Sequence, residues 1–151
     1  MARDQHQLTT VVIGDEPDGW ATAGFTVHDD RVRIGSTTIV CDPCAGQGIA
    51  VVGIDGLIDK VDGLPIGLAG APVTPAAEHR NRVTGFDHLV AMSPSIDRTA
   101  DALIDAGVQR RRTRRFEMGG ETRRQDFFWL GDVILELVGV DGAEGAGPAA
   151  F

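Results

Sequence analysis

The sequence predicts an α+β fold made of two tandem units, each ordered strand, helix, strand, strand, strand. One observation is a hairpin pattern that occurs twice, at residues 34–41 and 130–137: an apolar strand end, a glycine beside a polar residue, and a run of strand-forming residues. The other is a strand leading into a helix start upstream of each hairpin. Self-similarity of this kind indicates a repeated structural unit.

The first unit is predicted at residues 8–56. Its opening residues favour a strand, and Pro17 suits the first turn of a short helix that carries Trp20. Asp29 and Asp30 predict a hairpin turn. The predicted strands are 9–13, 25–28, 31–34 and 37–41, with the apolar run 48–54 as a further candidate.

The second unit is predicted at residues 85–141. Ser95 is a candidate N-cap, apolar residues follow it at helical spacing, and Gly107 ends the helix. The predicted strands are 86–92, 108–117, 121–130 and 133–138. Residues 57–84, with several Gly and Pro, are expected to link the units, and residues 142–151 to form a loose tail of the same single domain.

Charge and composition exclude several classes of function. The 151 residues carry 14 basic and 22 acidic side chains, a net charge of −8, which disfavours nucleic acid and anionic membranes as partners. No apolar run is long enough to span a bilayer, and the first residues do not resemble a signal peptide, so a cytoplasmic protein is expected. Cys41 and Cys44 form a CxxC without a second pair, which favours two reduced thiols in a turn.

The repeated units resemble the vicinal oxygen chelate superfamily, which includes glyoxalase I, extradiol dioxygenases and bleomycin-resistance proteins. The resemblance rests on residues 85–90 (Gly-Phe-Asp-His-Leu-Val), the helix at 99–107 and residues 133–138 (Val-Ile-Leu-Glu-Leu-Val). It implies two βαβββ units forming a curled mixed sheet around a pocket, and a homodimer. In enzymes of this superfamily each unit gives a divalent metal one ligand from its first strand and a Glu from its last. In the second unit those positions correspond to His88 and Glu136. In the first unit they correspond to Thr10 (or Thr9) and Val40, so half of the metal site is missing.

Glu136 and His88 are also the most informative residues on their own chemistry. Glu136 shares a strand face with apolar side chains, where a carboxylate is costly unless it is paired or coordinated. It could be a metal ligand, a general base or an anchor for a substrate donor; alternatively it reaches water or pairs with an Arg. His88 could ligate a metal or shuttle a proton, or be a core histidine bonded to a carbonyl or to Glu136.

Arginines and aromatic residues supply the remaining candidates. The arginine-rich run at 110–115 is typical of a solvated strand edge; alternatively, it forms a pocket mouth that attracts an anionic substrate. Strand alternation puts Arg110, Arg112 and Arg114 on one face. Arg124 could join it across the turn. Phe127 and Trp129 share a face that either packs in the core or lines the pocket. Thr10, Phe127, Trp129 and Arg124 are the predicted ligand-binding residues.

We therefore expect a small-molecule-binding protein of the glyoxalase-like type, without a complete metal site and with an anion among its possible ligands. The alternative is a metal-dependent lyase, isomerase or dioxygenase in which His88 and Glu136 are catalytic residues and metal ligands. The expected cofactor is accordingly none, or one divalent metal ion.

Overall fold

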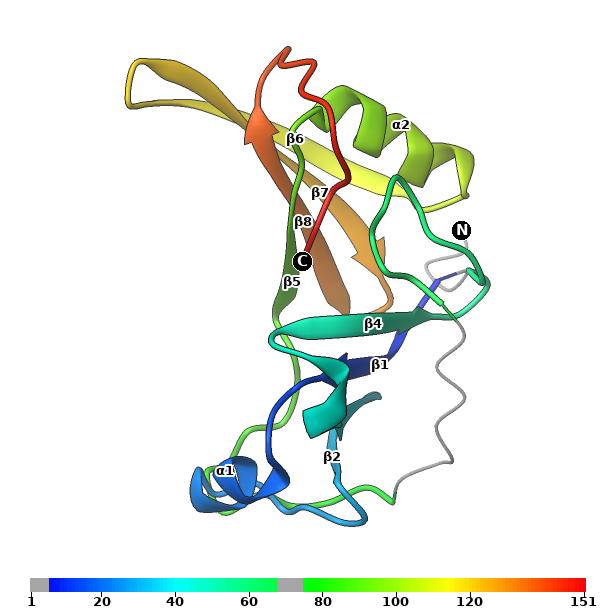
Figure 1. Ribbon diagram of the computed structural model, residues 1–151, viewed down its shortest axis with the longest axis vertical. Coiled ribbons are helices and arrows are strands. Elements are labelled where there is room, and N and C mark those ends of the chain that lie inside the picture. The colour runs from blue at the N-terminus through cyan, green and yellow to red at the C-terminus, as the bar shows by residue number, and fades with distance from the viewer. Residues whose placement is uncertain (1–5, 68–74) are drawn as a thin grey trace.

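The computed structural model describes residues 6–67 and 75–151, and the chain forms two four-stranded sheets within them (Figure 1). The first sheet has the strand order β2-β3-β1-β4 and the second β5-β8-β7-β6. The first sheet consists of β1 Leu8–Ile13, β2 Arg31–Ile34, β3 Thr37–Cys41 and β4 Ile49–Ile54. The second consists of β5 His88–Met92, β6 Arg110–Met118, β7 Glu121–Leu130 and β8 Val133–Val140. The helices are α1 Pro17–Thr22, α2 Ile96–Asp105 and a short 3-10 helix at Pro43–Ala45.

The second unit has the predicted βαβββ order. β5 runs parallel to β8, and β8, β7 and β6 continue as antiparallel neighbours. α2 covers one face of this sheet and buries Ile96, Thr99, Ala100 and Leu103. Ser95 stands directly before the helix as predicted, but its side chain does not cap it; the Ser93 hydroxyl instead accepts a hydrogen bond from the Ser95 amide. The Ser93 side chain therefore fixes the approach of the chain to α2.

The first unit departs from its predicted order at one strand. Residues 25–28 form no strand, because only His28 pairs with Arg31 around the Asp29 and Asp30 turn. The Thr26 amide instead donates to His79 Nδ1 at 3.0 Å, so this segment bonds to a loop distant in sequence. The candidate run at 48–54 is the fourth strand, β4, and pairs antiparallel with β1 on the side away from β3.

The predicted linker and tail contribute to the packed structure. Four apolar side chains of the connection are buried: Leu57, Val61, Leu64 and Ile66. Ala150 in the tail exchanges two backbone hydrogen bonds with Met92 of β5, and the tail is therefore not loose along its whole length. Residues 68–74 of the predicted linker lie outside the described residues, and the unit boundaries remain a prediction.

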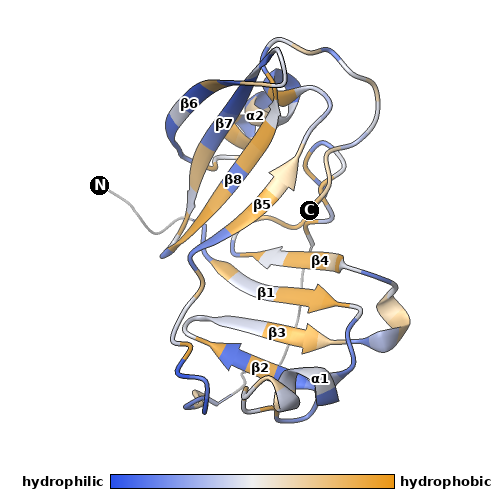
Figure 2. Ribbon diagram, turned by 90° about the vertical axis from the view of Figure 1, so that its left-hand side faces the viewer, coloured by the Kyte–Doolittle hydropathy of each residue, from blue (hydrophilic) through white to orange (hydrophobic). Residues whose placement is uncertain are grey.

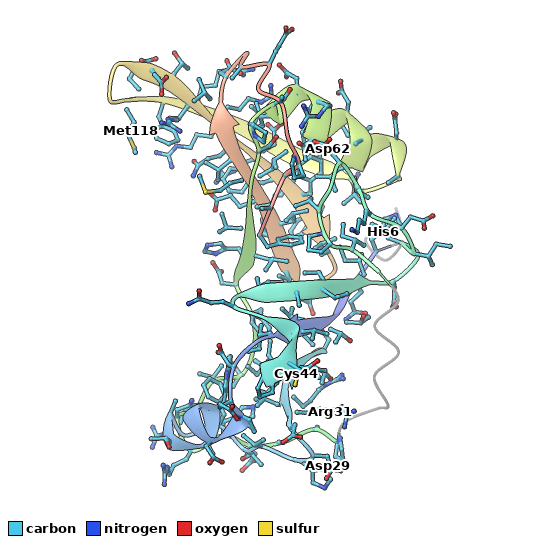
Figure 3. All side chains as sticks on the ribbon, viewed as in Figure 1. His6, Asp29, Arg31, Cys44, Asp62 and Met118 are labelled. Carbon is cyan, nitrogen blue, oxygen red and sulfur yellow. The ribbon has the colours of Figure 1, made fainter. Side chains whose placement is uncertain are left out.

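Arg98 of α2 joins the connection to the tail. Its guanidinium donates to Asp62 Oδ1 at 2.7 Å and to the carbonyls of Gly145 and Gly147. Thr99 also donates to Asp62, whose side chain is labelled in Figure 3. Burial raises the pKa of the Asp62 carboxyl, but the hydrogen bonds from Arg98 and Thr99 outweigh it and hold that pKa below its ordinary value.

One hydrophobic cluster contains buried residues of both sheets, of α2 and of the connection between the units. Cys41 lies in this cluster and Cys44 is exposed, and both are free thiols. Burial, with the nearby Asp15 and Asp30 charges, raises the pKa of the Cys41 thiol, which disfavours the thiolate needed for redox chemistry. Within residues 6–67 and 75–151, none of the helices has the length and apolar character to cross a bilayer.

Candidate functional site

The two faces of the second sheet have different surroundings. Burial alternates strictly over residues 124–130 of β7 and 133–139 of β8, and the buried positions face α2. We call the opposite side the open face. Its side chains are His88, Val90 and Met92 from β5, Ile134, Glu136 and Val138 from β8, Gln125, Phe127 and Trp129 from β7, and Arg111, Arg112, Arg114 and Phe116 from β6. Figure 2 shows hydrophilic colours on β6 and the outer part of β7, and mostly hydrophobic colours on β8.

A cavity of about 420 Å³ lies on the open face. Its lining residues are Asp87, His88, Arg111, Arg112, Arg114, Gln125, Phe127, Ile134 and Glu136. The volume is in the range of small-molecule sites, and the lining combines an aromatic ring with convergent polar groups, as such sites do. His88, Glu136 and Phe127, which were predicted from the sequence to act together, therefore meet at one cavity.

Glu136 and Gln125 form the hydrogen-bonded centre of this cavity. Gln125 Nε2 donates to Glu136 Oε1 at 2.5 Å, and the Glu136 side chain is only 15% exposed. The second carboxylate oxygen, Oε2, lies 3.9 Å from His88 Nε2, which is longer than a hydrogen bond. Glu136 thus holds one partner through Oε1 and presents Oε2 to the cavity.

His88 is oriented by its neighbour in sequence. Its Nδ1 lies 2.6 Å from Asp87 Oδ2, and since a carboxylate can only accept, Nδ1 donates this hydrogen bond. In the neutral ring, Nε2 is then an acceptor that faces Glu136. The His88 side chain is 44% exposed, so Nε2 is accessible from the cavity.

Three arginines of β6 form the other side of the cavity, each stacked on an aromatic ring. The guanidinium carbon lies 4.3 Å from the ring centroid for Arg111 over Trp129, 4.6 Å for Arg112 over Phe127 and 5.4 Å for Arg114 over Phe116. Stacking holds the planar groups in place while leaving their donors available.

A β-bulge decides which arginines reach the cavity. The pairing of β6 with β7 shifts between Arg110 and Arg112, so that Arg111 lines the cavity together with Arg112 and Arg114. Simple alternation predicted Arg110 in this group, but Arg110 lies on the helix-facing side, 3.6 Å from Asp126. A bulge adds a residue to one strand and re-aims the side chains beside it, which sequence alternation does not show.

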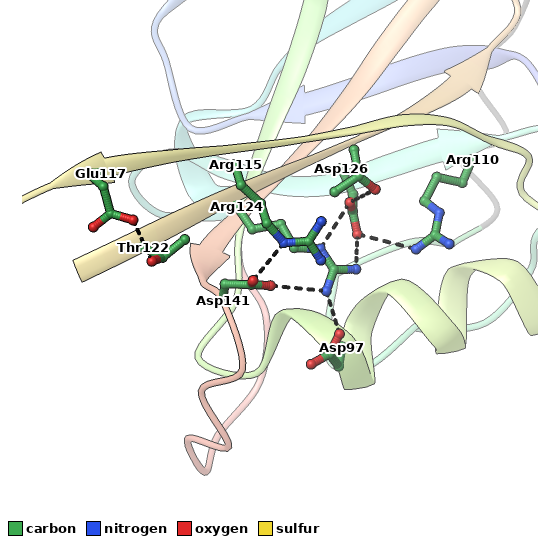
Figure 4. Close-up of polar contacts among 9 residues, drawn as sticks. Asp97, Arg110, Arg115, Glu117, Thr122, Arg124, Asp126 and Asp141 are labelled. Atoms are coloured by element: carbon green, nitrogen blue, oxygen red, sulfur yellow. Dashed lines mark hydrogen bonds and ion pairs between the residues drawn. The ribbon is translucent and has the colours of Figure 1, made fainter.

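Arg124 was predicted to bind ligand, but the structure does not bring it to the cavity. It follows the alternation of β7 onto the buried side, where it donates to Asp126 and to Asp97 of α2 and contacts Asp141 (Figure 4). Asp126 itself is fully buried and also accepts from Thr113 of β6. The hydrogen bond to Asp126 is the largest cause that raises the pKa of Arg124, against the opposing effect of burial. Arg124 therefore joins β7 to α2.

Thr10 is likewise separate from the cavity. It lies buried in β1, where it pairs with Thr38 of β3 and Gly53 of β4. Among the described residues, the cavity is lined from β5 to β8 and the residue before β5, and not from the first sheet. Trp129 is also predicted to bind ligand. It lies on the open face, where its ring stacks against the Arg111 guanidinium.

The residues at the cavity do not fit the metal ion that the family resemblance implies. His88 Nε2 and Glu136 Oε2 are two candidate ligands, and Asp87 is bonded to the opposite ring nitrogen of His88. Catalytic metal sites use three or more protein ligands. In residues 6–67 and 75–151, no group of three or more His, Cys, Asp or Glu side chains is arranged to hold a metal ion.

No family model and no curated protein matches the chain. Among solved structures, a mutant of 4-hydroxymandelate synthase from Streptomyces coelicolor is similar, with a TM-score of 0.56 and 17% sequence identity. The match covers 93% of this chain and 64% of the synthase chain, so this chain spans less than two thirds of that protein. Identity at this level shows the fold alone. The predicted α+β fold with tandem βαβββ units is confirmed.

Proposed function

We propose that the protein binds a small anionic molecule in the cavity on the open face of the second sheet. The observation that carries this proposal is the set of three arginines, Arg111, Arg112 and Arg114, stacked on aromatic rings at one cavity wall. Arginine donates in a planar fork that matches carboxylate and phosphate oxygens. The protein as a whole has a net charge of −8, so these arginines make the cavity wall an exception to its acidic composition.

Neighbouring arginines on the two faces of β6 provide a matched test. Arg114 lines the cavity, while Arg115 donates to Asp141 Oδ2 at 2.6 Å on the helix-facing side. With 3-phenylpropanoate as the probe in isothermal titration calorimetry, Arg112→Gln and Arg114→Gln are each expected to weaken binding by about tenfold, the effect of losing one charge-assisted contact. Arg115→Gln is expected to bind the probe as the unchanged protein does. Equal losses in Arg114→Gln and Arg115→Gln would show that the arginines act through net charge or stability and not through this cavity.

Binding without a metal is part of the same proposal, and the metal-dependent lyase, isomerase or dioxygenase is the alternative. The incomplete ligand set of His88 and Glu136 supports the metal-free function. Metal content of protein purified without chelator tests it, beside a Glu136→Ala variant. We expect a molar ratio of divalent metal to protein far below one. A ratio of one that falls to zero in Glu136→Ala would establish the alternative.

A second copy of the chain is proposed to cover part of the open face as a homodimer. Val90 and Met92 on β5 are 39% and 61% exposed, which is unusual for large apolar side chains on a sheet. An identical copy brings the same Thr10 and Val40, so dimerisation supplies no metal ligand of the kind that the first unit lacks. Analytical ultracentrifugation should show a dimer that Val90→Asp converts to a monomer; a monomeric unchanged protein would contradict this proposal.

A further inference from the structure

The cavity has two ends of opposite charge. Arg111, Arg112 and Arg114 on β6 form the positive end, and Asp87 and Glu136 form the negative end. Across the sheet, Arg112 pairs with Phe127, and Phe127 pairs with Glu136. Because adjacent strands are about 4.8 Å apart, the two ends start roughly 10 Å from each other and their side chains approach across the Phe127 ring. A simple anion would use the positive end alone.

Two acceptor atoms face each other at the negative end. Glu136 Oε2 lies 3.9 Å from His88 Nε2, and these atoms are not hydrogen bonded to one another. The other atom of each group already has its partner: Gln125 donates to Glu136 Oε1, and His88 Nδ1 donates to Asp87. Among the described residues, neither Glu136 Oε2 nor, in the neutral ring, His88 Nε2 has a hydrogen-bond donor, so both are open to a donor from a ligand.

The spacing of these acceptors suits a donor group that carries at least two hydrogens. A donor atom about 2.8 Å from each would meet the two acceptors at an angle of about 90° across their 3.9 Å separation. An ammonium nitrogen has three hydrogens in a compact arrangement and can satisfy both acceptors at once. A hydroxyl has one hydrogen and would leave one acceptor unpaired. The carboxylate of Glu136 further favours a positively charged donor.

We infer that the ligand is a zwitterion of the amino acid class, with its ammonium group between His88 Nε2 and Glu136 Oε2 and its carboxylate on the β6 arginines. This inference rests on the proposed function, since it places the anionic group of the ligand at the same arginines. It also gives the two residues that correspond to family metal ligands a different task, which is to hold the cationic end of the ligand. Phe127, on which Arg112 stacks, lines the cavity between the two ends.

Three matched probes test the inference by calorimetry: L-phenylalanine, 3-phenylpropanoate, which lacks the amine, and 2-phenylethylamine, which lacks the carboxylate. A longer set of 6-aminohexanoate, hexanoate and hexylamine tests a wider separation of the charges. In at least one set, the zwitterion is expected to bind about tenfold more tightly than both of its partners. Glu136→Gln is expected to reduce the zwitterion to the affinity of the amine-free probe while leaving that probe within about twofold. Arg115→Gln serves as the control and is expected to change neither the affinity for the zwitterion nor that for the amine-free probe.

The outcomes separate this inference from the proposed function. If the amine-free carboxylates bind as tightly as the zwitterions, the zwitterion assignment is overturned and anion binding stands. If a zwitterion is preferred and Glu136→Gln does not change the preference, the ammonium is held elsewhere and the inference is also overturned. If neither zwitterions nor carboxylates bind, both proposals fail.

Discussion

Each sheet contains one parallel pair of strands, β1 with β3 in the first and β5 with β8 in the second, but the two pairs carry different side chains. The matched pairs are Thr10 with Thr38 and Val12 with Val40 in the first sheet, and His88 with Ile134 and Val90 with Glu136 in the second. His88 and Glu136 thus stand at the positions of Thr10 and Val40. The comparison shows that the repeat keeps its backbone register while only the second copy carries ionisable groups at these positions.

The two sheets also differ in how their strands and helices are buried. In β3, Thr37, Thr38 and Ile39 are buried in succession, so both faces of the strand are covered, whereas burial in β8 alternates. α1 has six residues and buries none of them, while α2 has ten and buries four. Segment 57–67 pairs with β4 at Val52 and adds to the packing of the first sheet. Both faces of β3 are therefore covered by other parts of the chain, whereas β8 has one buried face and one face that is only partly buried.

The largest effect is expected from breaking the buried ion network of the second sheet. Asp126 is 0% exposed and accepts from Arg124 and Thr113, so Asp126→Asn leaves the Arg124 guanidinium without its main partner. Loss of one member of a buried pair costs about 3–5 kcal/mol in the free energy of unfolding. Urea denaturation measures it, with the exposed Asp101→Asn as control. A loss below about 1 kcal/mol would contradict the role of this network.

The two faces of β8 should differ in the next largest effect. Leu135 is fully buried against the α2 side, and Leu135→Ala is expected to cost about 2–5 kcal/mol of unfolding free energy. Ile134 is half-buried on the open face, and Ile134→Ala is expected to cost less than half as much while weakening the binding of 3-phenylpropanoate. Equal destabilisation by both substitutions would show that the open face is part of the core.

Acid should weaken the link between the first unit's connection and the tail. The pKa of Asp62 in the folded protein is below its ordinary value. The ionised carboxylate therefore contributes fully to the free energy of unfolding above the ordinary pKa, and this contribution is lost as the pH falls through the folded-state pKa. Asn tolerates the positive φ of 47° at this position, and Asp62→Asn is expected to lower the free energy of unfolding by about 1–2 kcal/mol at pH 7. The gap between this variant and the unchanged protein should narrow below about pH 4. A gap that stays constant down to pH 3 would contradict the role of the carboxylate.

The smallest effect on stability is expected at Glu136. Glu136→Val gives the second sheet the residue that the first sheet has at Val40. Glu136 bonds to Gln125 at the cavity and is not part of the buried ion network. The free energy of unfolding, measured by thermal denaturation, should therefore change by about 1 kcal/mol or less. The preference for zwitterions should disappear in the same variant. A loss of several kcal/mol would make Glu136 a structural residue.

The elements with strong periodicity could be predicted from the sequence. Strand β7 begins and ends at the predicted residues, Glu121 and Leu130, and α2 begins directly after Ser95. Residues 25–28 were wrongly predicted as a strand because the partner of Thr26 is His79, more than fifty residues away. The tail was predicted to be loose because its anchor, Arg98, lies on a different element. In each case the deciding contact is tertiary and leaves no local signal.

The same distinction holds for the site. The place of Glu136 and His88 at the cavity could be predicted because strand alternation and the family resemblance both identify them, and that of Phe127 because of alternation and its aromatic ring. Gln125 and Asp87 were not singled out, because a Gln on a strand and an exposed Asp are common features. Their importance depends on contacts of 2.5 Å to Glu136 and 2.6 Å to His88. The placement of Arg111 depends on the bulge in β6, which only the paired strands reveal.

The central claim is that ligand binds on the open face of the second sheet and not on the first sheet. Backbone amide spectra from ¹⁵N-labelled protein, titrated with 3-phenylpropanoate, test it most directly. The account predicts the largest shifts at residues of β5, β6, β7 and β8 that border the cavity, such as His88, Arg112 and Phe127, with the amides of β1 and β3 unchanged. Shifts concentrated in β1 and β3, or no shifts up to the solubility limit of the probe, would contradict it.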